Sequence, residues 1–174
     1  MSSDLEKAAK TAIFLEEEGY AIYTKGANNS KNVLGSSTLM AIAEKELMHK
    51  KAIQNFYARI TGKEFNASSD WENTKWSEKL KTQVLDSIKA SLEKSVAPEK
   101  ELLNAYEAGM ELERKGYDFY KKISDETDDA AAKKLFAFLA KEENIHYDLL
   151  QDTHLYLSNP SEWFHKEENW LVEG

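Results

Sequence analysis

The sequence Glu46-Leu-Met-His49 recurs as Glu143-Asn-Ile-His146, 97 residues further along the chain, and the same offset carries Glu16 onto Glu113. Each half of the chain therefore supplies two carboxylates and one imidazole. A two-metal site in a four-helix bundle uses this set of ligands: one Glu from each of two helices and one Glu-x-x-His from each of the other two. The repeat thus predicts both a fold and a metal site.

The repeat includes residues that do not bind metals. Leu15, Gly19, Tyr20, Tyr23, Lys25 and Ala43 recur as Leu112, Gly116, Tyr117, Tyr120, Lys122 and Ala140. An internal repeat of this length indicates a duplicated supersecondary unit, here a pair of helices. We therefore expect two antiparallel helical hairpins related by an approximate twofold axis.

Composition favours an all-α protein with a single domain over residues 1–174. The chain has 41% hydrophobic and 31% charged residues, with 7 Gly and 2 Pro, which suits helices better than sheets. A net charge of −8 argues against a nucleic-acid partner. There is no long apolar run and no signal-peptide pattern at the N-terminus, so we expect no membrane association and a cytoplasmic location.

The apolar spacing predicts where the helices lie. The first should run from residue 4 to about 26, and the second should have its N-cap among Ser36, Ser37 and Thr38 and end at Gly62. Residues 62–97 form the expected crossover, with an extra helix whose apolar stripe is Trp76, Leu80, Val84, Ile88, Leu92 and Val96.

The second hairpin should begin at Pro98, placed in the first turn of a helix that ends near residue 123. The last long helix should extend to about residue 157, and residues 158–174 form a C-terminal tail. Two hairpins joined by a long crossover are typical of ferritin-like bundles.

The six repeated residues suit oxygen- and nitrogen-binding metals. Because positions i and i+3 share a helix face, Glu46 with His49, and Glu143 with His146, can each point to one place. Four carboxylates and two neutral imidazoles balance two divalent cations in charge, and buried without cations they would be very costly. Iron or manganese fits such ligands, and zinc is compatible. The chain has no cysteine, so cysteine-bound metal centres are excluded.

Two repeated residue types around the ligands suggest further roles. Gly19 and Gly116 each follow a proposed ligand by three residues, and space above the metals would explain a helical glycine there. Tyr23 and Tyr120 lie two turns after Glu16 and Glu113 in sequence, so each phenol could hydrogen-bond a metal-bound carboxylate, with ordinary core packing as the alternative.

A single Glu-x-x-His match is weak support for a metal site, because Glu is abundant in this chain. Glu162-Trp-Phe-His165 has the same spacing, but its positions 97 residues earlier are Phe65 and Ser68. We interpret this third copy as coincidence. Six ligand-type residues at one offset favour a metal site over a salt-bridged helix surface.

The repeated segments resemble the rubrerythrin-like branch of the ferritin-like superfamily. The stretches that carry the resemblance are 15–23, 43–49, 112–120 and 140–146. The resemblance implies a di-iron centre with Glu16 and Glu113 as terminal carboxylates, Glu46 and Glu143 as bridging carboxylates, and His49 and His146 as imidazole ligands.

The resemblance also implies an activity, reduction of hydrogen peroxide at the di-iron centre. Rubrerythrins commonly receive electrons through a cysteine-bound rubredoxin module, which is missing here, so an external electron-donor protein is expected. The family's site typically has a further carboxylate one turn after the ligand on the third bundle helix. That position is Gly116 here, which implies a more symmetric site.

Three functions are therefore open at this stage. The first is a di-iron peroxidase or oxidase acting on hydrogen peroxide or dioxygen. The second is a ferroxidase or iron-handling protein, and the third is a non-enzymatic helical scaffold. A homodimer is expected from the family and from the apolar crossover stripe.

Overall fold

The computed structural model describes residues 2–63, 76–90 and 97–173, and helices make up almost all of them. The elements are α1 (Ser2–Asn28), α2 (Val33–Thr61), α3 (Trp76–Ala90), α4 (Lys100–Glu126), α5 (Ala130–Ser158) and α6 (Pro160–Glu173). Among these described residues, no helix combines the length and the apolar character needed to cross a membrane.

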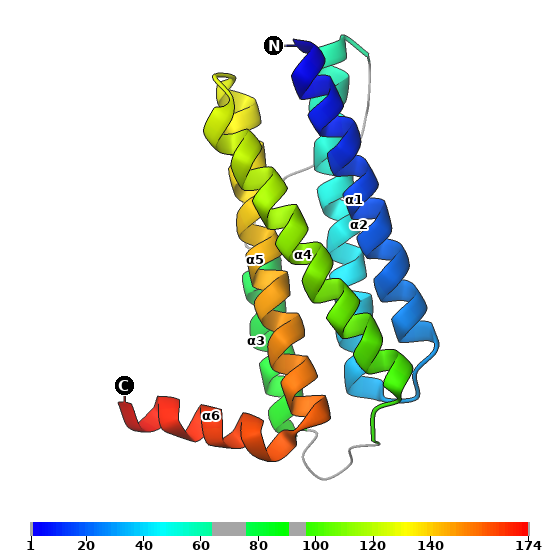
Figure 1. The fold of residues 1–174 in the computed structure, drawn as a ribbon, viewed down its shortest axis with the longest axis vertical. Helices are drawn as coiled ribbons and strands as arrows, with labels where there is room; N and C mark the ends of the chain where they lie inside the picture. Colours follow the sequence, from blue (N-terminus) through cyan, green and yellow to red (C-terminus); the bar gives the residue numbers. More distant parts are fainter. Residues whose placement is uncertain (1, 64–75, 91–96, 174) are drawn as a thin grey trace.

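Four long helices form the bundle (Figure 1). Helices α1 and α2 make one antiparallel hairpin and α4 and α5 make the other, with α1 packed on α4 and α2 on α5. Helix α3 of the crossover packs against α5 and α2, and α6 packs against α5 and projects away from the bundle at its lower end in Figure 1. The predicted all-α, ferritin-like bundle is confirmed.

The repeat extends to the helix boundaries, because α2 and α5 have 29 residues each and their N-caps, Asn32 and Asp129, are 97 residues apart. Asn32 Oδ1 accepts a hydrogen bond from the Gly35 amide, and Asp129 accepts from the amides of residues 131 and 132. The predicted N-cap among residues 36–38 was wrong. The amide-capping geometry of Asn32 starts α2 earlier, which leaves Ser36 and Ser37 inside the helix, bonded back to its carbonyls.

The remaining helix boundaries agree with the sequence prediction at Gly62 and differ from it at Pro98 and in the tail. Gly62 does end α2, in the left-handed conformation with φ 68°. Pro98 precedes α4 rather than occupying its first turn, because Glu99 is the N-cap and the helix starts at Lys100. Residues 160–173 of the expected tail form α6, with Pro160 at the first helical position, where its missing N–H costs nothing.

The crossover stripe packs as expected where it is described. Leu80, Val84 and Ile88 are buried. Leu92 and Val96 lie outside the described residues. Trp163 of α6 is also buried and packs edge-to-face against Tyr156 of α5, at 5.5 Å between ring centroids. Both additional helices therefore cover apolar surface of the four-helix bundle.

Two apolar clusters fill the bundle, one toward each end. The first includes Tyr23, Leu39 and residues of α3, and the second includes Phe56 and Tyr120. All six predicted ligand positions lie outside these apolar clusters. The bundle therefore has a polar layer between two apolar ones, and Tyr23 lies in one apolar cluster whereas its repeat equivalent, Tyr120, lies in the other.

Close approach of α1 and α4 depends on a glycine. A Cβ at Gly26 would lie 2.6 Å from Ala105 Cβ and 2.9 Å from Leu39 Cδ1. Overpacking of this kind typically costs about 1–3 kcal/mol. We expect Gly26→Ala to lower the free energy of unfolding by that amount in urea titrations.

A double-mutant cycle with Ala105→Gly provides the control for this prediction. Removing the opposing methyl group should make the double variant less destabilised than the sum of the two single variants. Strict additivity would contradict the proposed contact.

Candidate metal centre

Six ionisable side chains from four helices meet in the polar layer. They are Glu16 of α1, Glu46 and His49 of α2, Glu113 of α4, and Glu143 and His146 of α5. Each is at most 5% exposed. Helical spacing explains the convergence, because the Glu and His of each Glu-x-x-His pair lie one turn apart on the face that points into the bundle.

The His49 imidazole joins the two hairpins. Its Nδ1 lies 3.4 Å from Glu16 Oε2 in its own hairpin and 3.4 Å from Glu143 Oε1 in the other. Its ring stacks on His146 with 5.3 Å between centroids and 18° between planes. One nitrogen of this side chain therefore faces carboxylates from two different helices.

His146 has the equivalent surroundings in the second half. Its Nδ1 lies 3.0 Å from Glu46 Oε1 and 3.7 Å from Glu113 Oε2. Ligand atoms of both Glu-x-x-His pairs lie within 4.8 Å of one another, which is close enough for them to hold a metal ion. The approximate twofold symmetry expected from the repeat is thus present in the site itself.

Two of the four repeated tyrosines, Tyr23 and Tyr120, donate hydrogen bonds across the hairpins. Tyr23 OH donates to Glu113 Oε1, and Tyr120 OH donates to Glu16 Oε1 at 2.5 Å. Burial and the nearby carboxylates, Glu113 for Tyr23 and Glu16 for Tyr120, raise the pKa of each phenol well above its usual value. Both phenols therefore keep their protons and orient the carboxylates, in addition to filling the core.

The carboxylate oxygens that face the centre of the site are the observation that best indicates a cation. Within the described residues, Glu16 Oε2, Glu46 Oε1, Glu113 Oε2 and Glu143 Oε1 are buried and make no hydrogen bond. Buried polar atoms normally have a partner, and leaving one without costs roughly 1–3 kcal/mol or more for a charged group. Divalent cations would supply partners for all four oxygens, so the residues fit a two-metal centre.

Electrostatics in the protein without metal support the same interpretation. Burial, followed by the neighbouring carboxylates, raises the pKa of Glu46 and Glu143 well above the usual value of 4.5. Burial opposes ionisation of Glu16 too, but His49 is close enough to lower its pKa, and Glu16 in turn raises the pKa of His49 against the effect of burial. Without a metal, the cluster therefore retains protons.

The two repeated glycines leave room for carboxylate side chains, whereas we had expected them to leave open space above the metals. A Cβ at Gly19 would lie 3.2 Å from Glu46 Oε2, and one at Gly116 would lie 2.6 Å from Glu143 Oε2. Each glycine therefore lies against the carboxylate of the helix with which it forms a hairpin. This contact gives a reason for a helical glycine, which usually costs about 0.5–1 kcal/mol relative to alanine.

Two buried residues at the site were not found by sequence reasoning. Glu142 Oε2 lies 3.7 Å from His49 Nε2, and Ser77 Oγ lies 2.8 Å from His146 Nε2 and donates to Glu142 Oε2 at 2.7 Å. The residue 97 positions before Glu142 is Lys45, so the repeat gave no signal for this acid. Its i,i+4 spacing from His146 could have indicated a shared face. Ser77 belongs to the crossover, which has no repeat.

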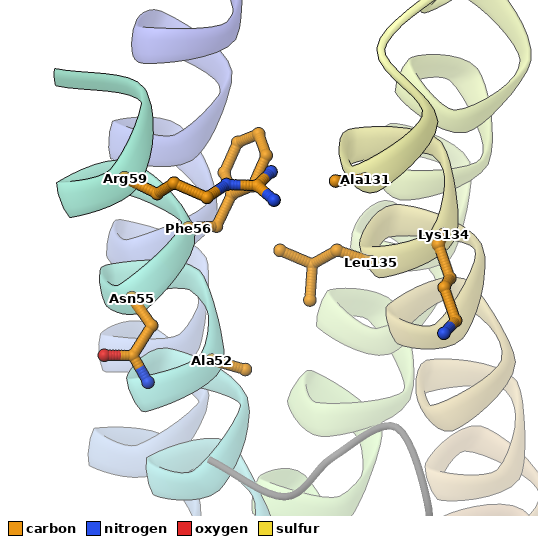
Figure 2. A pocket seen from close by; sticks show the side chains of 7 residues that line it. All are labelled: Ala52, Asn55, Phe56, Arg59, Ala131, Lys134 and Leu135. Atoms are coloured by element: carbon orange, nitrogen blue, oxygen red, sulfur yellow. The ribbon is translucent and has the colours of Figure 1, made fainter. Parts of the chain in front are cut away.

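A pocket elsewhere between α2 and α5 lacks metal-binding character. It is lined by Ala52, Asn55, Phe56, Arg59, Ala131, Lys134 and Leu135 (Figure 2). Arg59 lies over the Phe56 ring at 5.3 Å from its centroid.

The third Glu-x-x-His also lies apart from the centre, since Glu162 and His165 are exposed and Glu162 accepts a hydrogen bond from Asn159.

Fold and site together define a ferritin-like four-helix bundle with a buried carboxylate–histidine centre. The sequence model of the rubrerythrin family matches residues 7–154, which include all four bundle helices almost completely. The chain therefore belongs to the rubrerythrin family. Searches of curated proteins and of solved structures give no significant match.

The two glycines offer a matched test of the site geometry. Gly116→Ala should displace the Glu143 carboxylate, whereas Gly19→Ala requires Glu46 to move only a few tenths of an ångström. We expect Gly116→Ala to weaken Fe(II) or Co(II) binding about tenfold, and more than Gly19→Ala does.

The stability of the metal-free protein should not fall with the metal affinity of the Gly116→Ala variant. The displaced group is the end of a flexible side chain, and alanine favours a helix by up to about 1 kcal/mol. Chelator-treated Gly116→Ala protein should therefore unfold at an unchanged or higher urea concentration. Equal metal affinities for the two variants would contradict the assigned contact.

The raised pKa values of Glu46 and Glu143 predict how stability depends on pH. Above the unfolded-state value of 4.5, the unfolded chain releases protons that the folded protein retains, so the stability due to these groups falls as the pH rises. In Glu46→Gln/Glu143→Gln the amides stay neutral. The metal-free double variant should therefore become more stable relative to the wild type as the pH is raised from about 4 to about 8 in urea titrations.

The comparison with wild type separates this effect from the other titrating groups, including Glu16 and His49. Stability curves that stay parallel over the whole range would show that the two carboxyls ionise normally in the fold.

Proposed function

We propose that this chain is a di-iron protein that reduces hydrogen peroxide with electrons from an external donor. The observation that carries the proposal is the set of four buried carboxylate oxygens directed at one place beside two imidazoles. Carboxylate-rich ligation with two imidazoles suits iron or manganese. Membership of the rubrerythrin family favours iron.

Each of the six residues has a role in this proposal. Glu16 and Glu113, fixed by the tyrosines, would each bind one metal ion at the sides of the site. Glu46 and Glu143 belong to Glu-x-x-His pairs, and each also lies near the imidazole of the opposite hairpin, so they are suited to bridge the two ions. His49 and His146 would each bind one ion through Nδ1, the nitrogen that faces the carboxylates.

Small molecules can approach the site from one face. A pocket of about 330 Å³ lies between α4 and α5 and is lined by Glu113, Arg114, Tyr117, Asp118, Glu143, Asn144 and Tyr147. It includes two of the proposed ligands among its lining residues. In this proposal, hydrogen peroxide reaches the centre through this pocket.

The chemistry follows from the charge and proton balance of the site. When bound, two Fe(II) ions would supply the two electrons that convert hydrogen peroxide and two protons into two water molecules. The four carboxylates would balance the charge of two divalent cations, and the buried layer would exclude bulk water. Tyr23 and Tyr120 retain their protons and hold Glu113 and Glu16 in position through the reaction.

Electrons must then return to the site from outside. These 174 residues contain no cysteine and hence no cysteine-bound iron of their own. A separate electron-donor protein stays part of the proposal, and the expected homodimer stays a prediction.

An anaerobic Fe(II) titration followed by stopped-flow mixing tests the proposal. We expect two Fe(II) bound per chain and oxidation of both by one equivalent of hydrogen peroxide, faster than by dioxygen. Glu46→Gln/Glu143→Gln should abolish both binding and peroxide-dependent oxidation. Lys50→Ala, which removes only an ion pair with Glu17 on the outer surface of the first hairpin, serves as the control.

The other outcomes point to other functions. Continued iron uptake far beyond two per chain, with dioxygen as the faster oxidant, would favour iron handling. Absence of tight binding, with melting unchanged by Fe(II), would leave a helical scaffold, because a ligand specific to the folded state must raise stability.

A further inference from the structure

The two imidazoles of the metal centre have equivalent surroundings on their Nδ1 sides and different surroundings on their Nε2 sides. We call the Nε2 side the back of each imidazole. The Nδ1 atoms of His49 and His146 face equivalent carboxylates, but their Nε2 atoms face different groups. Behind His146 lies Ser77 of α3, and behind His49 lies Glu142 of α5. Neither group has a counterpart in the other half, since α3 lies outside the repeat and Lys45 occupies the position equivalent to Glu142.

Behind His146, the Glu142 carboxylate determines which atom donates in each hydrogen bond, because a carboxylate can only accept. Ser77 donates its hydroxyl proton to Glu142 Oε2 at 2.7 Å. Its oxygen is then left to accept from His146 Nε2, at 2.8 Å, so that this nitrogen carries the proton. The Nδ1 of His146 consequently directs its lone pair toward Glu46 and Glu113, where a cation is needed.

The Nε2 atom of His49 faces the same oxygen. It lies 3.7 Å from Glu142 Oε2, close enough for a modest shift of the carboxylate to form a hydrogen bond. Ser77 is fully buried and Glu142 is 2% exposed, so water does not compete for these contacts. One carboxylate oxygen therefore lies behind both imidazoles, linked to His146 through Ser77 and 3.7 Å from His49 Nε2.

Helix α3 is fixed on the bundle in a way that keeps Ser77 in place. Glu78, the next residue, accepts a hydrogen bond from Lys141 of α5 at 2.6 Å, and Lys81 contacts Asp148 of α5 at 3.3 Å. Leu80 is buried in the apolar cluster below the site. The crossover thus contributes a polar side chain to the centre in addition to its apolar cover.

We propose that Ser77 and Glu142 are positioning residues that fix the Nε2–H form and the orientation of His146 and His49, so that both Nδ1 atoms are presented to the metals. This inference rests on the proposed metal centre. Outer groups that hold a histidine ligand typically affect metal affinity by about 10–100-fold. Because the contacts differ between the two imidazoles, the two metal positions should be chemically inequivalent despite the repeated ligands.

Co(II) titration of the full chain, followed by its visible absorption, tests the affinity. We expect Ser77→Ala and Glu142→Ala each to weaken binding about 10–100-fold, and Glu142→Gln, which keeps an acceptor oxygen, to fall between wild type and Glu142→Ala. The matched controls are Lys45→Ala, at the equivalent position in the other half, and Ser87→Ala, at an exposed serine of the same α3. Both controls should bind Co(II) as wild type does.

A second measurement reports on the histidines themselves and would not respond to a purely structural role. In Zn(II)-loaded, ¹⁵N-histidine-labelled protein, two ligand imidazoles should show slowly exchanging Nε2–H protons. Ser77→Ala should lose the signal of His146, and Glu142→Ala that of His49. If Glu142→Ala fails to fold, Glu142→Gln and Ser77→Ala still decide the question.

The outcomes separate this inference from the function on which it rests. Wild-type affinity and unchanged Nε2–H signals in the variants would overturn the positioning role while leaving the metal centre intact. Failure of the wild type to bind Co(II) or Zn(II) would overturn both.

Discussion

The constraint on which this structure depends is the burial of six ionisable side chains in the middle of a four-helix bundle. Removing four carboxylates and two imidazoles from water costs far more than the packing around them can return, unless protons or cations balance the charge. The raised pKa values of Glu46 and Glu143 describe the first solution, and the unbonded oxygens at the centre point to the second. The apolar clusters on either side can form in any helical bundle, whereas the polar layer requires this particular pairing of hairpins.

The sequence was informative about the site because the duplicated segments include the ligand-type residues as well as the apolar residues of the helices. A fixed offset placed Glu16 and Glu113 on equivalent helices and both Glu-x-x-His pairs on the other two, and helical geometry then required them to meet. Helix existence followed from apolar periodicity, and the family assignment followed from the same stretches. All of these signals are periodic or repeated, which is the kind of information that a single sequence contains.

What the sequence did not predict depends on single contacts. The start of α2 is set by one amide-capping contact of Asn32, which competes with three plausible hydroxyl caps nearby. The role of the two glycines depends on which atom lies opposite, and this is known only after the hairpins close. Glu142 and Ser77 lie in positions without a repeat, so their approach to the imidazoles arises from the docking of α3 on α5. Contacts of this type depend on tertiary packing, and they leave no repeated or periodic signal in the sequence.

The crossed tyrosine contacts have a consequence for how the chain folds. Tyr23 and Glu113 are 90 residues apart in sequence, and Tyr120 and Glu16 are 104 apart, whereas each hairpin closes through local contacts. Local structure forms quickly, and pairing of distant segments has to overcome a larger loop-closure entropy. The hairpins should therefore assemble first and dock afterwards, in a step that creates the polar layer and its phenol–carboxylate bonds together. The rate at which the six side chains come together would then be set by this docking, so the protein has no partial centre before the hairpins meet.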